Sequence, residues 1–475
     1  MSVSLRKPFV IALGSAIALA LFWVGMSYPL DLRVRGDALG YLKIADSFNS
    51  FASVWTYAGE RTIGLPLFEF AIRQALSLFS PTVYLLPWIN AIGIAMLAIH
   101  LIASWLFSIW SRRAGLFHAS ATGYVLFVYL ATSPALVGHT TSPLSDTFSI
   151  DLILLGLVAL ASALQAERTR IHLLYCGLAA GCLAFSVLVR PASLLGLGAA
   201  LLACGLVTLR GPPSSRITIG AVVLGSLLLL AVPSWNCAEK YGSACLQSPK
   251  TFNANLSMQD GLRGGRLMWS QKNDFPGTIP MVTDASMFDA YYRSCRIESS
   301  IGFSDTSLMG CLLARPLTLP AFVAKKWIGL FDYFRFTPYM ENLTPTWLRI
   351  LSRAYGALAW LGLTMCIVTV LALHKQSVRT IVRAQLTTQT GLVFLATYSA
   401  VMLAQHTALH TEERYGFPLI PICAAVLFGY GERAIVRYRS GRGRSIEPWL
   451  VLCAMALTLF VVQISAWDRL SFAQG

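Results

Sequence analysis

The sequence predicts an all-α polytopic membrane protein with about eleven transmembrane helices. Hydrophobic residues make up 56% of the 475 residues, charged residues make up 12%, and the mean hydropathy is +0.62. This composition excludes a soluble globular domain. The apolar residues fall into blocks of roughly 20, the length that crosses a hydrocarbon core of about 30 Å. The short segments between these blocks are alternately rich and poor in arginine and lysine, as in proteins that cross a membrane repeatedly.

The predicted spans follow one another along the chain with one long interruption. In chain order they are 8–28, 82–108, 116–138, 147–166, 171–189, 192–209, 216–235, 348–373, 386–405, 415–431 and 447–467. The first block follows Arg6 and Lys7, as in a signal peptide, but no clear small-residue cleavage site precedes Asp31. We therefore expect this block to remain as a transmembrane helix.

Basic residues decide the expected orientation, because cytoplasmic loops of membrane proteins carry an excess of lysine and arginine. A cytoplasmic N-terminus places every basic short loop in the cytoplasm, and an odd number of spans then places the C-terminus outside. The cytoplasmic basic residues would be Arg6, Lys7, Arg112, Arg113, Arg168, Arg170, Arg210, Arg216, Lys375, Arg379, Arg383, Arg433, Arg437, Arg439, Arg442 and Arg444. Contact with anionic membrane lipids explains the formal net charge of +15 without a nucleic-acid partner.

Two long outside segments divide the chain into three expected parts. Residues 1–235 form an N-terminal transmembrane region, which includes a first outside loop at 29–81. Residues 236–347 form an extracytoplasmic insertion, because this segment is too long to be a simple connection. Residues 348–475 form a C-terminal transmembrane region.

Both outside segments are expected to carry helices that lie along the membrane surface. Residues 37–51 and 63–79 show mixed apolar and polar faces at helical spacing. Near the end of the insertion, Lys325 and Lys326 adjoin several aromatic residues within 315–334. This pattern favours an interfacial helix over a span.

Four of the ten cysteines lie in the insertion and predict disulfide bonds. An even number of cysteines in an oxidising compartment favours two bridges, and four cysteines permit three pairings. Proximity in the sequence favours Cys237 with Cys245 and Cys295 with Cys311.

The polar residues of the chain are expected to gather at the outer membrane face. The first outside loop carries five charges between Arg33 and Asp46, directly after an apolar helix. Other ionisable residues fall near the outer ends of spans: Asp146, Asp151, Arg190, His406, His410, Glu412, Glu413 and Arg414. A transporter would carry such residues at mid-depth, so the chemistry is expected at the outer face.

Five segments resemble motifs of polytopic GT-C type glycosyltransferases that use polyprenyl-phosphate-linked sugars. Asp37-x-x-x-Tyr41 is similar to the acidic motif of their first outside loop. The others are Arg61-Thr-Ile-Gly-Leu-Pro-Leu-Phe68, Thr140-Thr-Ser-Pro-Leu-Ser-Asp146, Val189-Arg-Pro-Ala-Ser193 and Glu413-Arg-Tyr-Gly-Phe-Pro-Leu-Ile-Pro421. The chain looks closest to the group of protein mannosyltransferases and lipid A aminoarabinose transferases, over about residues 30–205 and 405–430.

The resemblance implies transfer of a hexose or pentose at the periplasmic face of a bacterial inner membrane. The donor would be a polyprenyl-phosphate sugar, and the acceptor a hydroxyl of a lipid, glycan or protein. Asp37 would act as the base, and the anomeric centre would be inverted. Cations would stabilise the leaving phosphate, and the implied substrate-binding residues are Tyr41, Glu60, Arg61, Asp146, Arg190, Lys325, Lys326, Glu413, Arg414 and Tyr415.

Several residues of these segments also have a purely structural interpretation. Asp37 and Asp146 could stabilise helix N-termini. Arg33 and Arg35 could lie among lipid headgroups, and Asp46 could be a solvated charge. A further set could be snorkelling or interfacial side chains: Arg190, Lys325, Lys326, Arg414 and Tyr415.

No cofactor is firmly predicted, although a divalent cation between Asp37 and Glu60 stays open. His406 and His410 have the i, i+4 spacing of zinc ligands, but a glutamate at the His-Glu-x-x-His position is missing. Three other functions also stay open: a transporter or flippase of lipid-linked sugars, a glycan polymerase or ligase, and a non-enzymatic assembly subunit.

Overall fold

The computed structural model is mostly helical. It describes residues 6–34, 36–166, 168–194, 197–198, 201, 213–248, 267–269, 281–283, 344–375, 398–399, 401–404 and 413–439. The predicted span 447–467, the interfacial helix at 315–334 and nearly all of the span 386–405 lie outside these residues. Most of the span 192–209 does as well, so the count of eleven spans and the three-part division stay predictions.

Six helices of the described part are long and apolar enough to cross a membrane. Their bounds are α1 Arg6–Met26, α6 Leu85–Arg113, α9 Ser145–Gln165, α10 Thr169–Val189, α12 Pro213–Tyr241 and α20 Ile420–Arg439. The described part also contains α17 Thr346–Lys375, which packs against α20. This chain is therefore an integral membrane protein.

The predicted span 116–138 is a bent pair of helices. α7 covers Ser120–Ala131 and α8 covers Pro134–Thr141, with 44° between them. Pro134 occupies the first turn of α8 and has no N–H for the hydrogen bond that would continue α7. Counted as one span, the pair raises the number of candidate spans to seven.

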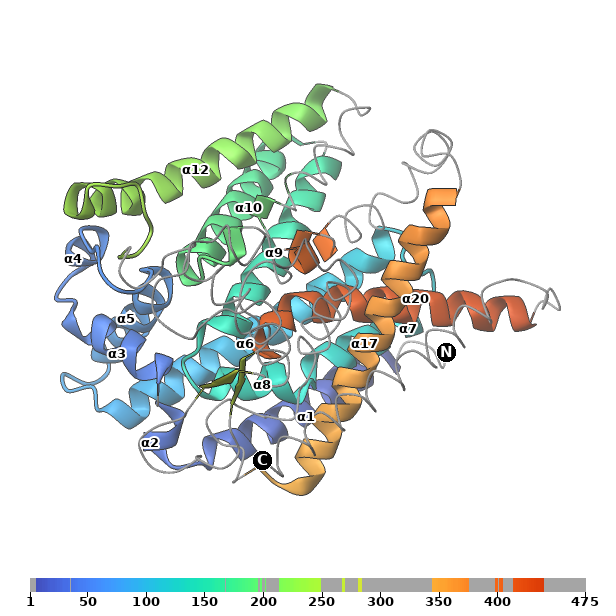
Figure 1. The fold of residues 1–475 in the computed structure, drawn as a ribbon, viewed down its shortest axis with the longest axis horizontal. Helices are drawn as coiled ribbons and strands as arrows, with labels where there is room; N and C mark the ends of the chain where they lie inside the picture. Colours follow the sequence, from blue (N-terminus) through green and yellow to red (C-terminus); the bar gives the residue numbers. More distant parts are fainter. Residues whose placement is uncertain are drawn as a thin grey trace, which may run out of the picture.

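The first outside loop folds into four short helices that gather on one side of the molecule (Figure 1). They are α2 Leu30–Arg33, α3 Asp37–Ser47, α4 Phe51–Trp55 and α5 Gly64–Ser77. The prediction of one helix over 37–51 is wrong at its end. Ser50 caps a new helix, because its side chain accepts a hydrogen bond from the Ser53 backbone while Ser53 bonds back to Ser50.

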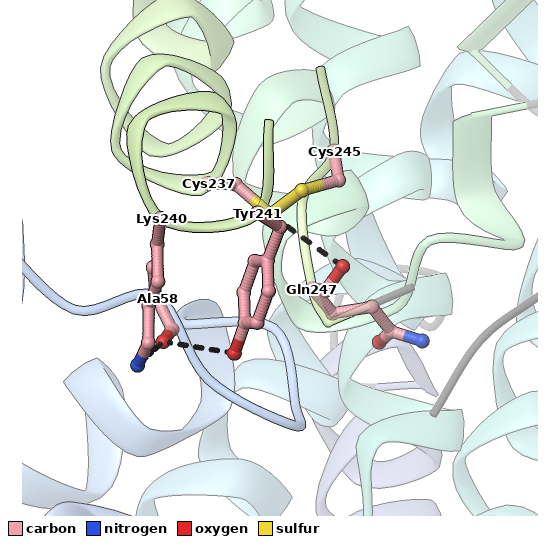
Figure 2. The surroundings of a disulfide bond; sticks show 6 residues. All are labelled: Ala58, Cys237, Lys240, Tyr241, Cys245 and Gln247. Carbon is pink, nitrogen blue, oxygen red and sulfur yellow. Dashed lines mark hydrogen bonds between the residues drawn. A yellow bond between two sulfur atoms is a disulfide. The ribbon is translucent and has the colours of Figure 1, made fainter. Parts of the chain in front are cut away.

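The outer end of α12 is tied to the segment that leads into α5. Cys237 and Cys245 form a disulfide bond (Figure 2). Beside it, Lys240 Nζ and Tyr241 Oη donate to the carbonyl oxygen of Ala58. The Ser248 backbone N–H also donates to the Gly59 carbonyl, at 2.7 Å. The bridged end of α12 thus supports the residues just before Arg61.

Replacing Cys237 and Cys245 together with serine should lower the thermal midpoint of the protein. The bridge closes a loop with a sequence separation of 8, and the loss of such a cross-link costs about 2.5 kcal/mol in the chain-entropy model. Thermal unfolding with and without reductant measures the effect. If reductant still lowers the thermal midpoint of the double variant, a second disulfide bond is present, as predicted for Cys295 and Cys311. A double variant as stable as the wild type would contradict the expectation.

The insertion contributes two short strands to the described part. β1 Leu267–Trp269 and β2 Met281–Thr283 pair antiparallel, with Leu267 opposite Thr283. Cys295 and Cys311 lie outside the described residues, so their pairing stays a prediction.

A buried ionisable pair lies in the middle of the helix bundle. His100, near the centre of α6, places Nδ1 2.9 Å from Asp151 Oδ1 and Nε2 3.0 Å from the Leu130 carbonyl oxygen. Both side chains are 2% exposed. His100, which the prediction did not name, thus places an ionisable group near the middle of a predicted span, where it pairs with Asp151, the seventh residue of α9. Contact with the imidazole compensates part of its desolvation cost.

Candidate functional site

The Asp37 carboxylate forms an ion pair with Arg61 at the start of α3. Arg61 Nη2 donates to Asp37 Oδ1 at 2.6 Å, and the side chains of Arg61 and Asp37 are 34% and 28% exposed. Gly36 precedes the helix with a φ of 61°, a conformation that glycine adopts at no steric cost. Asp37 lies in the first turn, where the helix dipole also favours a carboxylate. Gly36 is thus the N-cap residue and Asp37 makes no capping hydrogen bond, so only its favourable charge in the first turn remains of the structural interpretation, and this is compatible with a catalytic role.

Tyr41 connects this ion pair to the start of α9. It follows Asp37 by four residues and so lies on the same side of α3. The Arg61 guanidinium lies 5.4 Å from the centre of the Tyr41 ring. The buried Tyr41 hydroxyl donates to Ser145 Oγ at 3.5 Å. Ser145 precedes Asp146, so the contact brings two of the predicted motifs together.

A second ion pair joins the start of α9 to the end of α10. The Asp146 carboxylate contacts Arg190, the residue that follows α10, and its side chain is 2% exposed. His139 Nδ1 lies 3.7 Å from Asp146 Oδ2. The His139 ring packs edge to face on Phe417 at 4.8 Å between centroids. Phe417 belongs to η3, a 3-10 helix over Glu413–Leu419, so the last predicted motif also reaches this cluster.

The two ion pairs lie on either side of one tight packing contact. Thr62 Oγ1 donates to the Val189 carbonyl oxygen at 3.2 Å. A Cβ on Gly64 would lie 2.4 Å from the Val189 backbone nitrogen, so the start of α5 rests directly on the end of α10. Arg61 and Arg190 flank this contact in sequence. We call Asp37, Tyr41, Arg61, Asp146 and Arg190 the outer cluster.

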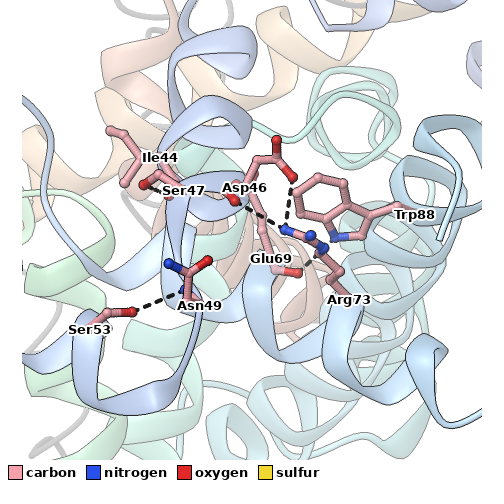
Figure 3. A network of polar contacts seen from close by, with 8 residues as sticks. All are labelled: Ile44, Asp46, Ser47, Asn49, Ser53, Glu69, Arg73 and Trp88. Carbon is pink, nitrogen blue, oxygen red and sulfur yellow. Dashed lines mark hydrogen bonds and ion pairs between the residues drawn. The ribbon is translucent and has the colours of Figure 1, made fainter. Parts of the chain in front are cut away.

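Two other charges of the first loop take structural positions. Arg33 is 1% exposed and donates to the Thr141 carbonyl oxygen and to Asn90 Oδ1, each at 3.0 Å. The expectation that Arg33 lies among lipid headgroups is therefore wrong, because these acceptors hold it inside the protein. Asp46 is exposed and accepts from Arg73 Nη1 at 2.8 Å, as the solvated interpretation expects (Figure 3).

The remaining predicted residues do not join the outer cluster in the described structure. Glu60 is exposed beside Arg61. The side chains of Glu413, Arg414 and Tyr415 lie outside the described residues, although their backbone belongs to η3. Five further residues lie entirely outside the described part of the chain: Arg35, Lys325, Lys326, His406 and His410. Within the described ranges, no group of three or more ligating side chains forms a metal site, and a divalent cation between Asp37 and Glu60 stays a hypothesis.

Sequence reasoning missed three residues at the outer cluster and one beside it. Ser145 stands within a quoted motif, and His139 directly precedes that motif, so adjacency was the available signal. Phe417 likewise lies inside a motif, but only Glu413, Arg414 and Tyr415 of that motif were predicted to bind substrate. No sequence pattern predicted the burial of Glu69, because its burial depends on helices from several parts of the chain.

Glu69 is a fully buried acidic residue on α5, the helix whose start packs against the end of α10. Its side-chain oxygens have no hydrogen-bond partner within the described part of the chain. Its backbone carbonyl accepts from Trp88 Nε1 at 2.8 Å, and the Arg73 guanidinium lies over the Trp88 ring (Figure 3). Burial raises the pKa of the Glu69 carboxyl well above its ordinary value. The folded protein therefore holds Glu69 as a neutral acid.

Replacing Glu69 with glutamine should make the protein more stable than the wild type at high pH. In the wild type, the part of the folding stability that depends on the Glu69 proton is largest below the unfolded-state pKa of about 4.3. It falls as pH rises toward the raised folded-state pKa, because only the unfolded state releases the proton in that window. Thermal midpoints measured from pH 5 to pH 8 should diverge. Glu60→Gln, an exposed control, should show the same pH dependence of the thermal midpoint as the wild type. If the midpoints of Glu69→Gln also ran parallel to those of the wild type, Glu69 would not be a neutral acid in the folded protein.

Comparison with solved structures relates this chain to an archaeal oligosaccharyltransferase. No family model and no curated protein matches the chain. The apo crystal structure of the Archaeoglobus fulgidus oligosaccharyltransferase matches with a TM-score of 0.50 and 12% identity, covering 95% of this chain and 55% of that chain. This chain therefore spans about half the length of that protein. The likeness shows the fold alone: this chain shares the fold of part of that enzyme.

Two further structures of the same archaeal enzyme also match. One is tethered via a disulfide bond to an acceptor peptide containing the NVT sequon, with a TM-score of 0.48, 10% identity, and coverage of 98% of this chain and 54% of that chain. The other is in complex with an inhibitory peptide and a dolichol-phosphate, with a TM-score of 0.43, 10% identity, and coverage of 97% and 55%.

Proposed function

We propose that this protein is a membrane glycosyltransferase that moves one sugar from a polyprenyl phosphate to an acceptor hydroxyl. The observation that carries the proposal is the Asp37–Arg61 ion pair beside Tyr41. It sets a partly exposed carboxylate next to a partly exposed guanidinium on a GT-C type scaffold. Such a pair supplies the two groups that the transfer needs, a proton acceptor and a phosphate ligand.

Asp37 would act on the acceptor and the arginines on the donor. The acceptor oxygen forms a bond to the anomeric carbon while its proton passes to an Asp37 oxygen. The bond from that carbon to the phosphate oxygen breaks, and the electron pair leaves with the phosphate. Arg61 and Arg190 would stabilise the charge that develops there. Attack opposite the leaving group inverts the anomeric centre.

The rest of the outer cluster would hold the substrates. Tyr41 is buried with its ring against Arg61, so it would hold that guanidinium in position for the donor. Asp146 holds the Arg190 guanidinium, so it would orient the second phosphate ligand. We expect the donor sugar to be a hexose or pentose and the acceptor to be a lipid, glycan or protein, at the periplasmic face of a bacterial inner membrane.

A donor panel tests the proposal. The purified full-length protein is incubated with labelled polyprenyl-phosphate sugars and a mixed acceptor pool, and the release of free polyprenyl phosphate is measured. We expect release from at least one monophosphate donor. Turnover restricted to a diphosphate-linked oligosaccharide would instead indicate a polymerase or ligase.

One observation favours a different function. His100, buried against Asp151 of α9, lies near the middle of α6, and ionisable groups at that depth are typical of transporters. A flippase would move the lipid-linked sugar across a vesicle membrane without cleaving it. Translocation of intact donor by proteoliposomes, without release of polyprenyl phosphate, would support this alternative.

A further inference from the structure

A cavity of about 430 Å³ opens at the basic end of the helix bundle. Its wall is almost entirely apolar and comes from the last turns of α6, the second half of α9 and the first half of α10. Lining residues include Leu106, Trp110, Arg113, Val158, Ser162 and Tyr175. Its volume falls in the range of roughly 300–1,000 Å³ that is usual for ligand sites.

This cavity is distinct from the outer cluster. Asp146 lies in the first turn of α9, whereas the cavity begins at Leu155 and reaches Ser162 on the same helix. At 1.5 Å per residue, the two are separated by roughly 15–25 Å along the helix axis. The cavity therefore lies toward the other end of α9 from the outer cluster.

Among the described residues that line the cavity, Arg113 alone is charged. It is exposed, and it has no ion-pair or hydrogen-bond partner among the described residues. Its neighbour Arg112 is equally exposed, but it donates to Ser120 Oγ at 2.6 Å and does not line the cavity. Arg168 and Arg170 add exposed positive charge near the start of α10. An apolar cavity whose wall carries the exposed Arg113 guanidinium calls for an apolar ligand with an anionic head.

We propose that this cavity binds an acyl chain of an anionic membrane phospholipid, with the lipid phosphate on Arg113. The apolar wall matches the chain, and the free guanidinium can bind phosphate oxygens in a bidentate manner. Basic pockets between transmembrane helices bind anionic headgroups in the same way. A zwitterionic lipid fits less well, because its own cation lies close to the arginines. The inference does not depend on the proposed transferase function.

Lipid titration followed by native mass spectrometry tests the site on the full-length protein in detergent. Phosphatidylglycerol and phosphatidylcholine with identical acyl chains serve as probes. We expect the wild type to retain one phosphatidylglycerol at about fivefold lower concentration than phosphatidylcholine, the effect of one arginine near a lipid phosphate. Arg113→Gln should abolish this preference. Arg112→Gln, the matched control, should keep it.

A cavity-filling variant tests the position of the acyl chain. Ala161 lines the wall, and Ala161→Phe should reduce the retention of both lipids while its thermal midpoint stays near the wild type. Equal retention of the two lipids by the wild type would overturn the proposal. So would an equal loss of preference in Arg112→Gln and Arg113→Gln, because this would indicate general surface charge. Dimers that disappear in Ala161→Phe would instead show that a second copy of the chain fills the cavity.

Discussion

The Asp37→Asn variant should lose sugar transfer while remaining folded. An amide cannot accept the proton of the attacking hydroxyl, so we expect turnover to fall by at least about 100-fold, the usual contribution of a general base. The thermal midpoint should change little, because the Asp37–Arg61 pair is partly exposed and such pairs contribute little to stability. Release of polyprenyl phosphate under saturating donor measures turnover.

Asp46→Asn is a closely matched control for this experiment. Asp46 lies on the same helix, α3, and pairs with Arg73 at 2.8 Å, much as Asp37 pairs with Arg61 at 2.6 Å. It should keep full activity, because it is outside the outer cluster. If Asp37→Asn retained most of its turnover, Asp37 would not be the base.

The Arg190→Gln variant should lose both stability and activity. It leaves the Asp146 carboxylate, which is 2% exposed, without its main positive partner. Breaking a buried ion pair on one side costs about 3 kcal/mol. The thermal midpoint should therefore fall clearly, and transfer should fall further because a phosphate ligand is lost. Arg73→Gln, which breaks an exposed pair, serves as the control.

A double variant separates the two effects of Arg190. Asp146→Asn combined with Arg190→Gln removes both charges, so much of the lost stability should return. Activity should stay low, because the phosphate ligand is still missing. Recovery of transfer together with stability would show that Arg190 only supports the structure.

Sequence patterns predicted the described spans well because each depends on local composition. The apolar blocks at 8–28, 82–108, 147–166, 171–189 and 216–235 all form long helices. The errors occurred where a single local contact intervenes. Pro134 bends the predicted span 116–138, and the Ser50 cap ends the predicted helix 37–51 early.

The residues of the outer cluster could be named from motifs, but their contacts could not. Nothing in the sequence links Asp37 to Arg61, or Asp146 to Arg190, because each pair spans a segment whose path is set by tertiary packing. The same reason explains the misplaced charges. Arg33 was placed among lipid headgroups by its structural interpretation and Asp151 near the outer end of a span, yet both side chains are buried against partners from distant segments.

The sequence by itself determined that the chain crosses a membrane, and it predicted a first outside loop that carries the candidate carboxylate Asp37. Both follow from properties of short segments, namely hydropathy over about 20 residues and a local motif. Only the tertiary structure decided which charges meet. The packing of Gly64 on Val189 brings the loop of Arg61 onto the helix end that carries Arg190. An ion pair requires side chains within about 4 Å, and that distance depends on how whole helices pack.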